Sequence, residues 1–145
     1  METRRTGSID WRAAAWAGIV YTLCVFTFAF VIGAIRVTLV APRLGNLLAV
    51  LLEAPIVLAA SWRLSLWCIR RFQVSADSRA RALMGIVAFS VLMALELGFS
   101  VLVFGETVDV YLAKYATTPG VIGLAMQVCF ATFPWMQNAP RVLGD

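Results

Sequence analysis

The sequence predicts an all-α integral membrane protein, built as a bundle of four transmembrane helices in a single domain that spans residues 1–145. Composition is the first reason, because 61% of the residues are hydrophobic and only 14% are charged. A soluble domain of 145 residues has too much surface for its volume to bury so many apolar side chains. The second reason is that these side chains form four runs, at about residues 13–40, 46–69, 82–104 and 119–137. Each run can cross a bilayer as a helix of roughly 20 residues, and none alternates as barrel strands do.

The first run follows a short polar head, in which Asp10 can cap a helix that begins near Trp11. It is about twice as long as the apolar core of a signal peptide, roughly 7–15 residues, so we expect a retained helix. Pro42 is expected to end this helix and Gly45 to permit a tight turn. Asn46 can then cap the second helix.

The second run contains Pro55, which should kink its helix because proline removes a backbone hydrogen bond. Ser75 or Asp77, in the loop that follows, can cap the third helix. Residues 105–120 form the sizeable external segment between the third and fourth helices. Its apolar side chains recur at helical spacing, which predicts a short amphipathic helix on the membrane surface, with an irregular loop as the alternative; they are Val108, Tyr111, Leu112 and Tyr115.

The distribution of arginine predicts the orientation in the membrane. In a four-pass arrangement, eight arginines flank helix ends on one side, whereas Arg43 and Lys114 on the other side are offset by Glu106 and Asp109. Cytoplasmic loops carry the excess of Lys and Arg, so both termini should be cytoplasmic. The net charge of +4 is thereby explained by topology, and nucleic acid is not an expected partner. The eight arginines are Arg4, Arg5, Arg12, Arg70, Arg71, Arg79, Arg81 and Arg141.

Polar residues within the apolar runs should face protein or water, because a charged side chain at the centre of a bilayer costs roughly 2.5–3.5 kcal/mol. The helical rise places four of them at one depth in the outer half of the bundle, whereas Arg63 lies near the cytoplasmic end. We expect a buried polar layer there, which serves either to fix helix register or to hold an ion or ligand. Its members are Arg36, Glu53, Glu96 and Gln127.

Within this layer, Arg36 and Glu53 lie on antiparallel neighbouring helices, and their side chains lean toward each other. The sequence therefore predicts an ion pair, with the alternative that Arg36 extends to the lipid headgroups instead. Because the layer holds two acids and one base, either Arg36 serves both carboxylates or one acid, such as Glu96, is protonated.

The third helix carries small residues on the face opposite Glu96, at Ser90, Ala94 and Gly98. Small side chains let membrane helices approach closely, so this helix-packing strip suggests contact with another subunit, such as a second copy of the chain.

Several short motifs resemble those of small bacterial inner-membrane proteins of uncharacterised function. These motifs are G-x-x-R at 33–36, P-R-L-G at 42–45, L-L-E-A-P at 51–55, R-A-L-M-G at 81–85 and L-E-L at 95–97. The resemblance covers residues 15–105 and implies a multi-pass protein of the bacterial inner membrane. It implies no activity.

No catalytic or cofactor signature is evident in the sequence. Histidine is absent, and Cys24, Cys68 and Cys129 are scattered through apolar runs, so His-based metal, haem and triad sites are excluded. We therefore expect no enzyme, no metal and no cofactor. The sequence favours a non-enzymatic accessory, assembly or structural subunit in the lipid bilayer. The alternative is a small oligomeric transporter or channel that uses a membrane glutamate as a proton or cation site.

Overall fold

The computed structural model describes residues 10–137, and these residues are almost entirely helical. The elements in chain order are α1 (Trp11–Ile35), the π-helical η1 (Arg36–Val40), α2 (Ala41–Leu44), α3 (Asn46–Arg71), α4 (Ser78–Leu102), α5 (Val108–Lys114) and α6 (Thr118–Met136). Within the described residues, four helical stretches are long and apolar enough to cross a membrane. The predicted all-α fold with four such helices is confirmed. The four stretches are Trp11–Leu44, Asn46–Arg71, Ser78–Leu102 and Thr118–Met136.

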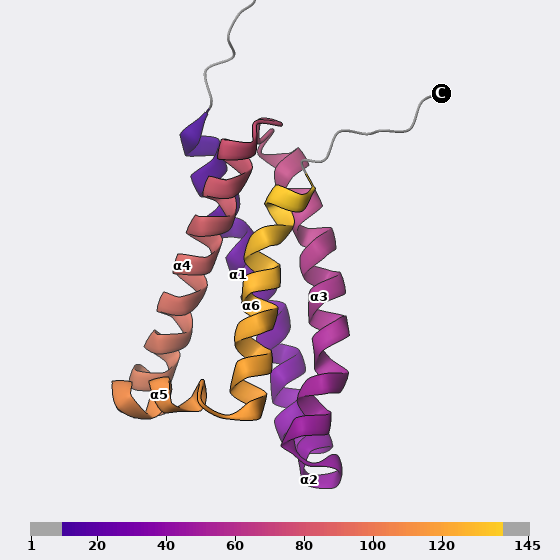
Figure 1. The fold of residues 1–145 in the computed structure, drawn as a ribbon, viewed down its shortest axis with the longest axis vertical. Helices are drawn as coiled ribbons and strands as arrows, with labels where there is room; N and C mark the ends of the chain where they lie inside the picture. Colours follow the sequence, from indigo (N-terminus) through magenta and orange to yellow (C-terminus); the bar gives the residue numbers. More distant parts are fainter. Residues whose placement is uncertain (1–9, 138–145) are drawn as a thin grey trace, which may run out of the picture.

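The long helices form a four-cornered bundle, in which α1 and α6 each pack against both α3 and α4 (Figure 1). Helices α3 and α4 therefore occupy opposite corners. Helix α1 begins and α6 ends at the same end of the bundle, whereas α2 and α5 lie at the other end (Figure 1). We call these the terminal end and the α5 end.

Side chains cap four of the helices, and Thr107 caps α5 by accepting a hydrogen bond from the N–H of Val110. Asp10 accepts hydrogen bonds from the backbone N–H groups of Arg12 and Ala13 and starts α1. Asp77 accepts a hydrogen bond from the N–H of Arg79 and starts α4, so Asp77 rather than Ser75 is the cap of this helix. Thr117 caps α6 in the same way. Each cap satisfies a donor that would otherwise have no partner in the first helical turn.

The turn between the first two long helices differs from the prediction. The first helix does not end at Pro42, because a π-turn precedes it and the N–H of Ala41 donates to the carbonyl of Arg36, five residues back. The widened turn accommodates the proline ring, and Pro42 then lies in the first turn of α2, where its missing N–H costs nothing. The chain reverses at Gly45, with φ +80°, and Asn46 is the first residue of α3 rather than its cap.

The terminal half of the bundle is densely packed. Gly18 and Gly85 bring backbones together, since a Cβ at Gly18 would lie 2.6 Å from the Met84 carbonyl oxygen and one at Gly85 would lie 2.1 Å from that of Ala131. Tyr21 crosses the bundle from α1, stacks on Phe130 of α6 with ring centroids 4.4 Å apart, and donates to its carbonyl at 3.1 Å. The two rings close the centre of the bundle at this level.

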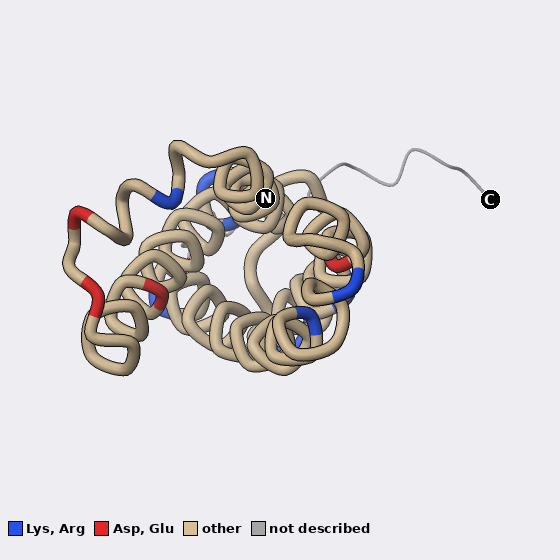
Figure 2. The backbone as a smooth tube through the Cα atoms, turned by 90° about the horizontal axis from the view of Figure 1, so that it is seen from below, with Lys and Arg blue, Asp and Glu red and all other residues tan. Residues whose placement is uncertain are grey.

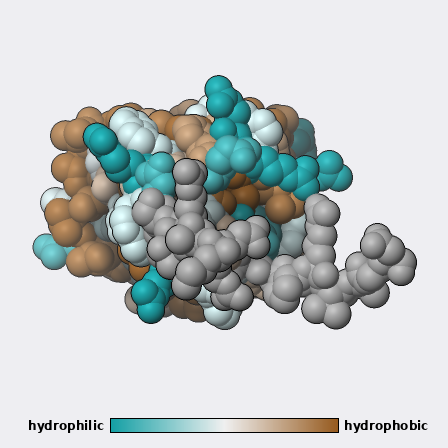
Figure 3. All heavy atoms as spheres, turned by 90° about the horizontal axis from the view of Figure 1, so that it is seen from above, coloured by the Kyte–Doolittle hydropathy of each residue, from teal (hydrophilic) through white to brown (hydrophobic). Residues whose placement is uncertain are grey.

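The outer flanks are apolar, as a lipid-facing surface requires. Ile86, Leu102 and Phe104 are among many large side chains that lie mostly exposed on the bundle. Viewed from the terminal end, hydrophilic residues lie on the end face and hydrophobic ones along the flanks (Figure 3). Viewed from the α5 end, charged positions of both signs lie on the segment carrying α5 and at the opposite side of the bundle (Figure 2).

Candidate functional site

The half of the bundle toward the α5 end is hollow. A cavity of about 780 Å³ lies between α1, α3, α4 and α6, and a second of about 560 Å³ adjoins it between α1, α4, α5 and α6. Arg36, Glu96 and Gln127 line both, so the two cavities meet at these side chains. The inner end of the first cavity is lined by Leu92 and Phe130 of the packed core. Volumes of roughly 300–1,000 Å³ are typical of small-molecule sites.

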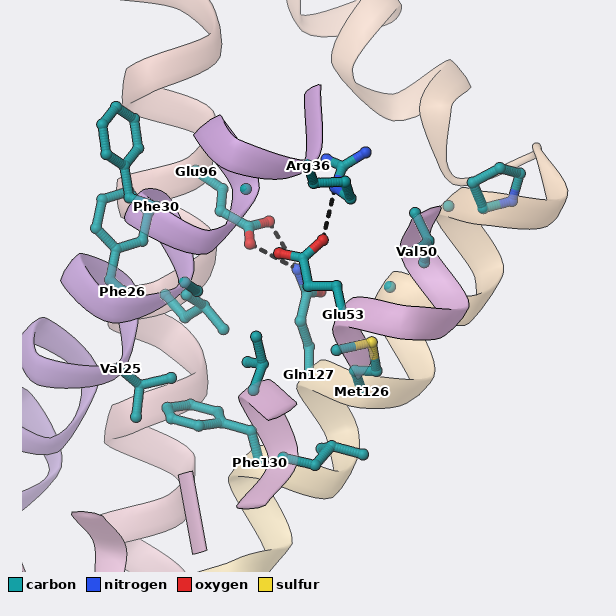
Figure 4. Close-up of a pocket in the computed structure, with 18 of the residues that line it drawn as sticks. Val25, Phe26, Phe30, Arg36, Val50, Glu53, Glu96, Met126, Gln127 and Phe130 are labelled. Atoms are coloured by element: carbon teal, nitrogen blue, oxygen red, sulfur yellow. Dashed lines mark hydrogen bonds and ion pairs between the residues drawn. The ribbon is translucent and has the colours of Figure 1, made fainter. Parts of the chain in front are cut away.

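Arg36 and Glu53 meet on one wall of this space (Figure 4). Arg36 Nε lies 2.6 Å from Glu53 Oε2, and the side chains are only 26% and 15% exposed. The N–H of Nε does not point at an acceptor, so the contact is an ion pair rather than an aligned hydrogen bond. Gly33, one turn before Arg36, faces this carboxylate, since a Cβ there would lie in ordinary van der Waals contact with Glu53 Oε1, at 3.7 Å. The predicted contact between Arg36 and Glu53 is present.

The backbone at Arg36 is itself irregular, because this residue begins η1. A π-turn inserts an extra residue into a helix and re-aims the side chains on either side of it. Such turns are frequent at functional sites. Here the turn stands where α1 passes the cavity wall.

Glu96 and Gln127 meet on the neighbouring wall (Figure 4). Gln127 Nε2 lies 2.7 Å from each carboxylate oxygen of Glu96, and Tyr115 donates its hydroxyl to Oε2 at 3.2 Å. Among residues 10–137, no Lys or Arg forms an ion pair with Glu96. The buried Oε1 of Gln127 has no hydrogen-bond donor within that part of the chain.

The expected single layer is therefore two pairs on the wall of one cavity. Arg36 pairs with Glu53 and does not serve both carboxylates. Glu96 is held by the neutral donors of Gln127 and Tyr115.

The other residues singled out from the sequence lie outside this contact network. Pro55 lies within α3, which continues past it to Arg71; the kink there stays a prediction. Ser90 and Ala94 are exposed, and a Cβ at Gly98 would meet nothing within 4 Å. The packing strip thus faces away from the bundle, and contact with another subunit stays a prediction.

The sequence interpretation did not include the tyrosines of the α5 segment in the site. The apolar residues predicted to share one face of α5 differ in burial, because Tyr111 is buried whereas Val108 and Leu112 are 48% and 57% exposed. The hydroxyl of Tyr111 lies 2.7 Å from that of Tyr115, which reaches Glu96. The sequence did contain a signal for this contact, because a buried tyrosine hydroxyl usually finds a polar partner.

Lys114 lines both cavities and helps to hold the α5 segment in place. Glu106 accepts hydrogen bonds from Lys114 and from Ser100 of α4, and these lower the pKa of its carboxyl. Burial raises the pKa of Tyr115, and the hydroxyl of Tyr111 adds to this effect. Burial also raises the pKa of Tyr111, so both phenols remain neutral donors at physiological pH.

Aromatic rings line the second cavity beside Glu96. Phe26 and Phe30 of α1 pack against Phe99 of α4, with ring centroids 5.2 and 5.7 Å apart. Figure 4 shows Phe26 and Phe30 next to Glu96. The site thus combines a carboxylate, an unused amide oxygen and an aromatic wall.

Comparison with known proteins found no matching family model, no similar curated protein and no similar solved structure. Within residues 10–137, no three acidic or cysteine side chains are grouped as ligands for a metal ion. The chemistry on which a function can be argued is therefore that of the cavity's own side chains, which include two carboxylates, the guanidinium of Arg36, the ammonium of Lys114 and two amides, and of its aromatic rings.

Proposed function

We propose that the protein is a small membrane transporter in which Glu96 carries a proton or a cation. The observation that supports this most strongly is the place of Glu96, on the wall of a cavity within the hydrophobic span and without a cationic partner in residues 10–137. Ionisable residues inside membrane spans are costly, and they commonly mark ion and proton pathways.

The charge distribution in the cavity supports a cation rather than an anion. Arg36 and Glu53 offset each other, and Lys114 is held by Glu106. Glu96 is the remaining charged group among the described residues that line the cavity. A proton or a cation bound there would neutralise a carboxylate that neutral hydrogen bonds alone stabilise.

The shape of the cavity supports binding from one side of the membrane. Its lining runs from Phe130 in the packed core to Asn46 and Thr117 at helix ends near the α5 end. Phe130 forms part of its inner end and stacks on Tyr21, which lines neither cavity. Transport requires that this packed half open in a second conformation, as in alternating access.

The test is proton uptake into liposomes that contain the purified protein and an internal pH dye, with the membrane potential clamped by potassium and valinomycin. Wild-type protein should give uptake above that of empty liposomes, and Glu96→Gln should abolish the excess. The matched control is Asp109→Asn, which removes an exposed acid of α5 and should retain uptake. Equal rates for wild type and Glu96→Gln contradict proton transport by Glu96.

The orientation is part of the same proposal. The arginine asymmetry supports cytoplasmic termini in a bacterial inner membrane, and the two described helix ends lie together at the terminal end (Figure 1). The cavity then faces the outer side.

A non-enzymatic accessory, assembly or structural subunit is the second candidate. The outward-facing strip of Ser90, Ala94 and Gly98 favours it, because small residues at an exposed helix face allow close contact with a partner helix. Purification from native membranes in a mild detergent should then yield a stoichiometric partner or a homo-oligomer. Recovery as a monomer without any partner contradicts this candidate.

A further inference from the structure

We propose that the cavity binds a primary organic ammonium with an apolar, aromatic body, such as an arylalkylamine. The inference rests on the proposed function, because it names the cation that the cavity takes. Three features carry it: a carboxylate without a cationic partner in the described chain, an amide oxygen without a donor there, and an aromatic wall beside both.

The cavity offers two hydrogen-bond acceptors, the carboxylate of Glu96 and the amide oxygen of Gln127. Glu96 already accepts from Gln127 Nε2 and from Tyr115, so both neighbours hold the carboxylate in place. The amide that donates to Glu96 leaves its own Oε1 buried and without a donor. Buried polar atoms are normally satisfied, so an unsatisfied one beside a cavity indicates a donor that is missing here.

These acceptors favour an organic ammonium over an inorganic cation. An inorganic cation would usually collect several oxygen ligands, and here no group of three acidic or cysteine side chains gathers in the described residues. A primary ammonium has three N–H donors, enough for Glu96 and for Gln127 Oε1 together. A quaternary ammonium offers charge without donors and would leave the amide oxygen unsatisfied.

The aromatic wall favours a ligand with an apolar, aromatic body. Phe26, Phe30 and Phe99 form a contacting aromatic group on the wall of the second cavity, which Glu96 also lines. Aromatic faces favour both apolar groups and neighbouring cations. The combined space of the two cavities accommodates a ring and a short alkyl chain.

The experiment measures binding to purified wild-type protein in detergent at pH 7.5, by titration calorimetry, with four probes that share a phenyl ring. The probes are 2-phenylethylammonium, its trimethylated quaternary form, neutral 2-phenylethanol and anionic 3-phenylpropionate. We expect 2-phenylethylammonium to bind at least about tenfold more tightly than each of the others, the factor that one additional charge-assisted hydrogen bond gives. Equal or tighter binding of the quaternary or the neutral probe overturns the proposal.

Variants then locate the site. Glu96→Gln and Gln127→Met should each weaken binding of 2-phenylethylammonium by about tenfold or more, and Phe30→Leu should weaken it less. Phe133→Leu is the matched aromatic control, because Phe133 packs on Trp62 away from both cavities, and should bind as wild type does. Unchanged binding by Glu96→Gln overturns the assignment. The wild-type comparison among probes stands even if a variant does not fold.

The liposome assay separates this inference from the proposed function. Proton uptake that depends on Glu96, together with no binding of 2-phenylethylammonium, overturns the ligand class and leaves the transporter proposal standing. Binding without any Glu96-dependent uptake supports the ligand class and contradicts proton transport.

Discussion

Breaking the Arg36–Glu53 ion pair should cost more stability than removing both partners. A charge that loses its partner inside the bundle keeps its desolvation cost, which for buried pairs amounts to about 3–5 kcal/mol. The lower end of this range applies here, because the side chains retain 26% and 15% exposure at a cavity wall. We therefore expect Arg36→Leu to lower the free energy of unfolding by about 3 kcal/mol.

The coupling between the two residues can be bounded from their separation. At 2.6 Å, Coulomb's law gives about 1.6 kcal/mol in a water-like medium and about 6 kcal/mol at an effective dielectric constant of ~20. Desolvation offsets part of the larger value, and the N–H of Arg36 Nε is not aligned as a hydrogen bond. We expect a coupling energy of about 2 kcal/mol, between these bounds.

The assay is reversible unfolding in mixed detergent micelles, applied to the wild type, Arg36→Leu, Glu53→Leu and the double variant. The double variant should recover part of the loss caused by Arg36→Leu. Glu53→Leu should cost less than Arg36→Leu, because Glu96 lines the same cavity as Arg36 and can take the place of Glu53. A coupling energy within about 0.5 kcal/mol of zero, the scatter between independent sites, would refute the reasoning.

Further predictions follow from the packed half, the α5 segment and the orientation. Gly85→Ala should lower thermal stability in detergent, because its Cβ would lie 2.1 Å from a backbone oxygen of α6, whereas Gly98→Ala on the same helix should be near neutral; equal effects would contradict the packing described here. Tyr21→Phe keeps the ring stack but loses the hydrogen bond to Phe130, so the free energy of unfolding should fall by about 1 kcal/mol, and an unchanged value would show that this bond adds nothing. The ionised carboxylate of Glu106 should stabilise the α5 segment fully above its ordinary pKa of 4.5, and this stabilisation should be lost as pH falls through its lowered pKa in the folded protein. The protection of α5 amides from hydrogen exchange, corrected for intrinsic rates, should therefore drop in acid. The same drop in Glu106→Gln would assign the effect to another group. Cysteines placed at Ser75 and Thr117, in a chain without its native cysteines, should differ in labelling by an impermeant reagent outside intact cells, and equal labelling of both would refute the proposed orientation.

The sequence predicts the long helices well because their apolar runs and caps act locally. Asp10 and Asp77 cap the helices that their positions suggest, and the spacing of Arg36 and Glu53 correctly brings the two together. Depth and helix direction alone fix that contact.

The remaining features of the site depend on geometry that one-dimensional spacing does not contain. The π-turn that begins at Arg36 changes the direction in which the following side chains point, and it lets the helical chain continue past Pro42. Proline usually ends or kinks a helix, so the sequence alone does not predict this. Tyr115 reaches Glu96 because the α5 segment folds against α4, a tertiary contact that amphipathic spacing assigns equally well to a membrane surface. The cavity arises because small residues such as Gly18 and Gly85 let the helices approach closely in one half of the bundle and not in the other, which no single helix pattern determines.

The central claim is that the half of the bundle holding Glu96 is an accessible cavity, whereas the other half is closed packing. Gly123 lines both cavities and has room for a side chain, with nothing within 4 Å of an added Cβ, while Ala88 is fully buried in the core. The most direct test compares Gly123→Cys with Ala88→Cys, each in a chain without its native cysteines, for the rate of reaction with a water-soluble methanethiosulfonate. Only a thiolate in contact with water reacts rapidly. We predict rapid modification of Gly123→Cys and none of Ala88→Cys, and equally slow reaction of both would contradict the account.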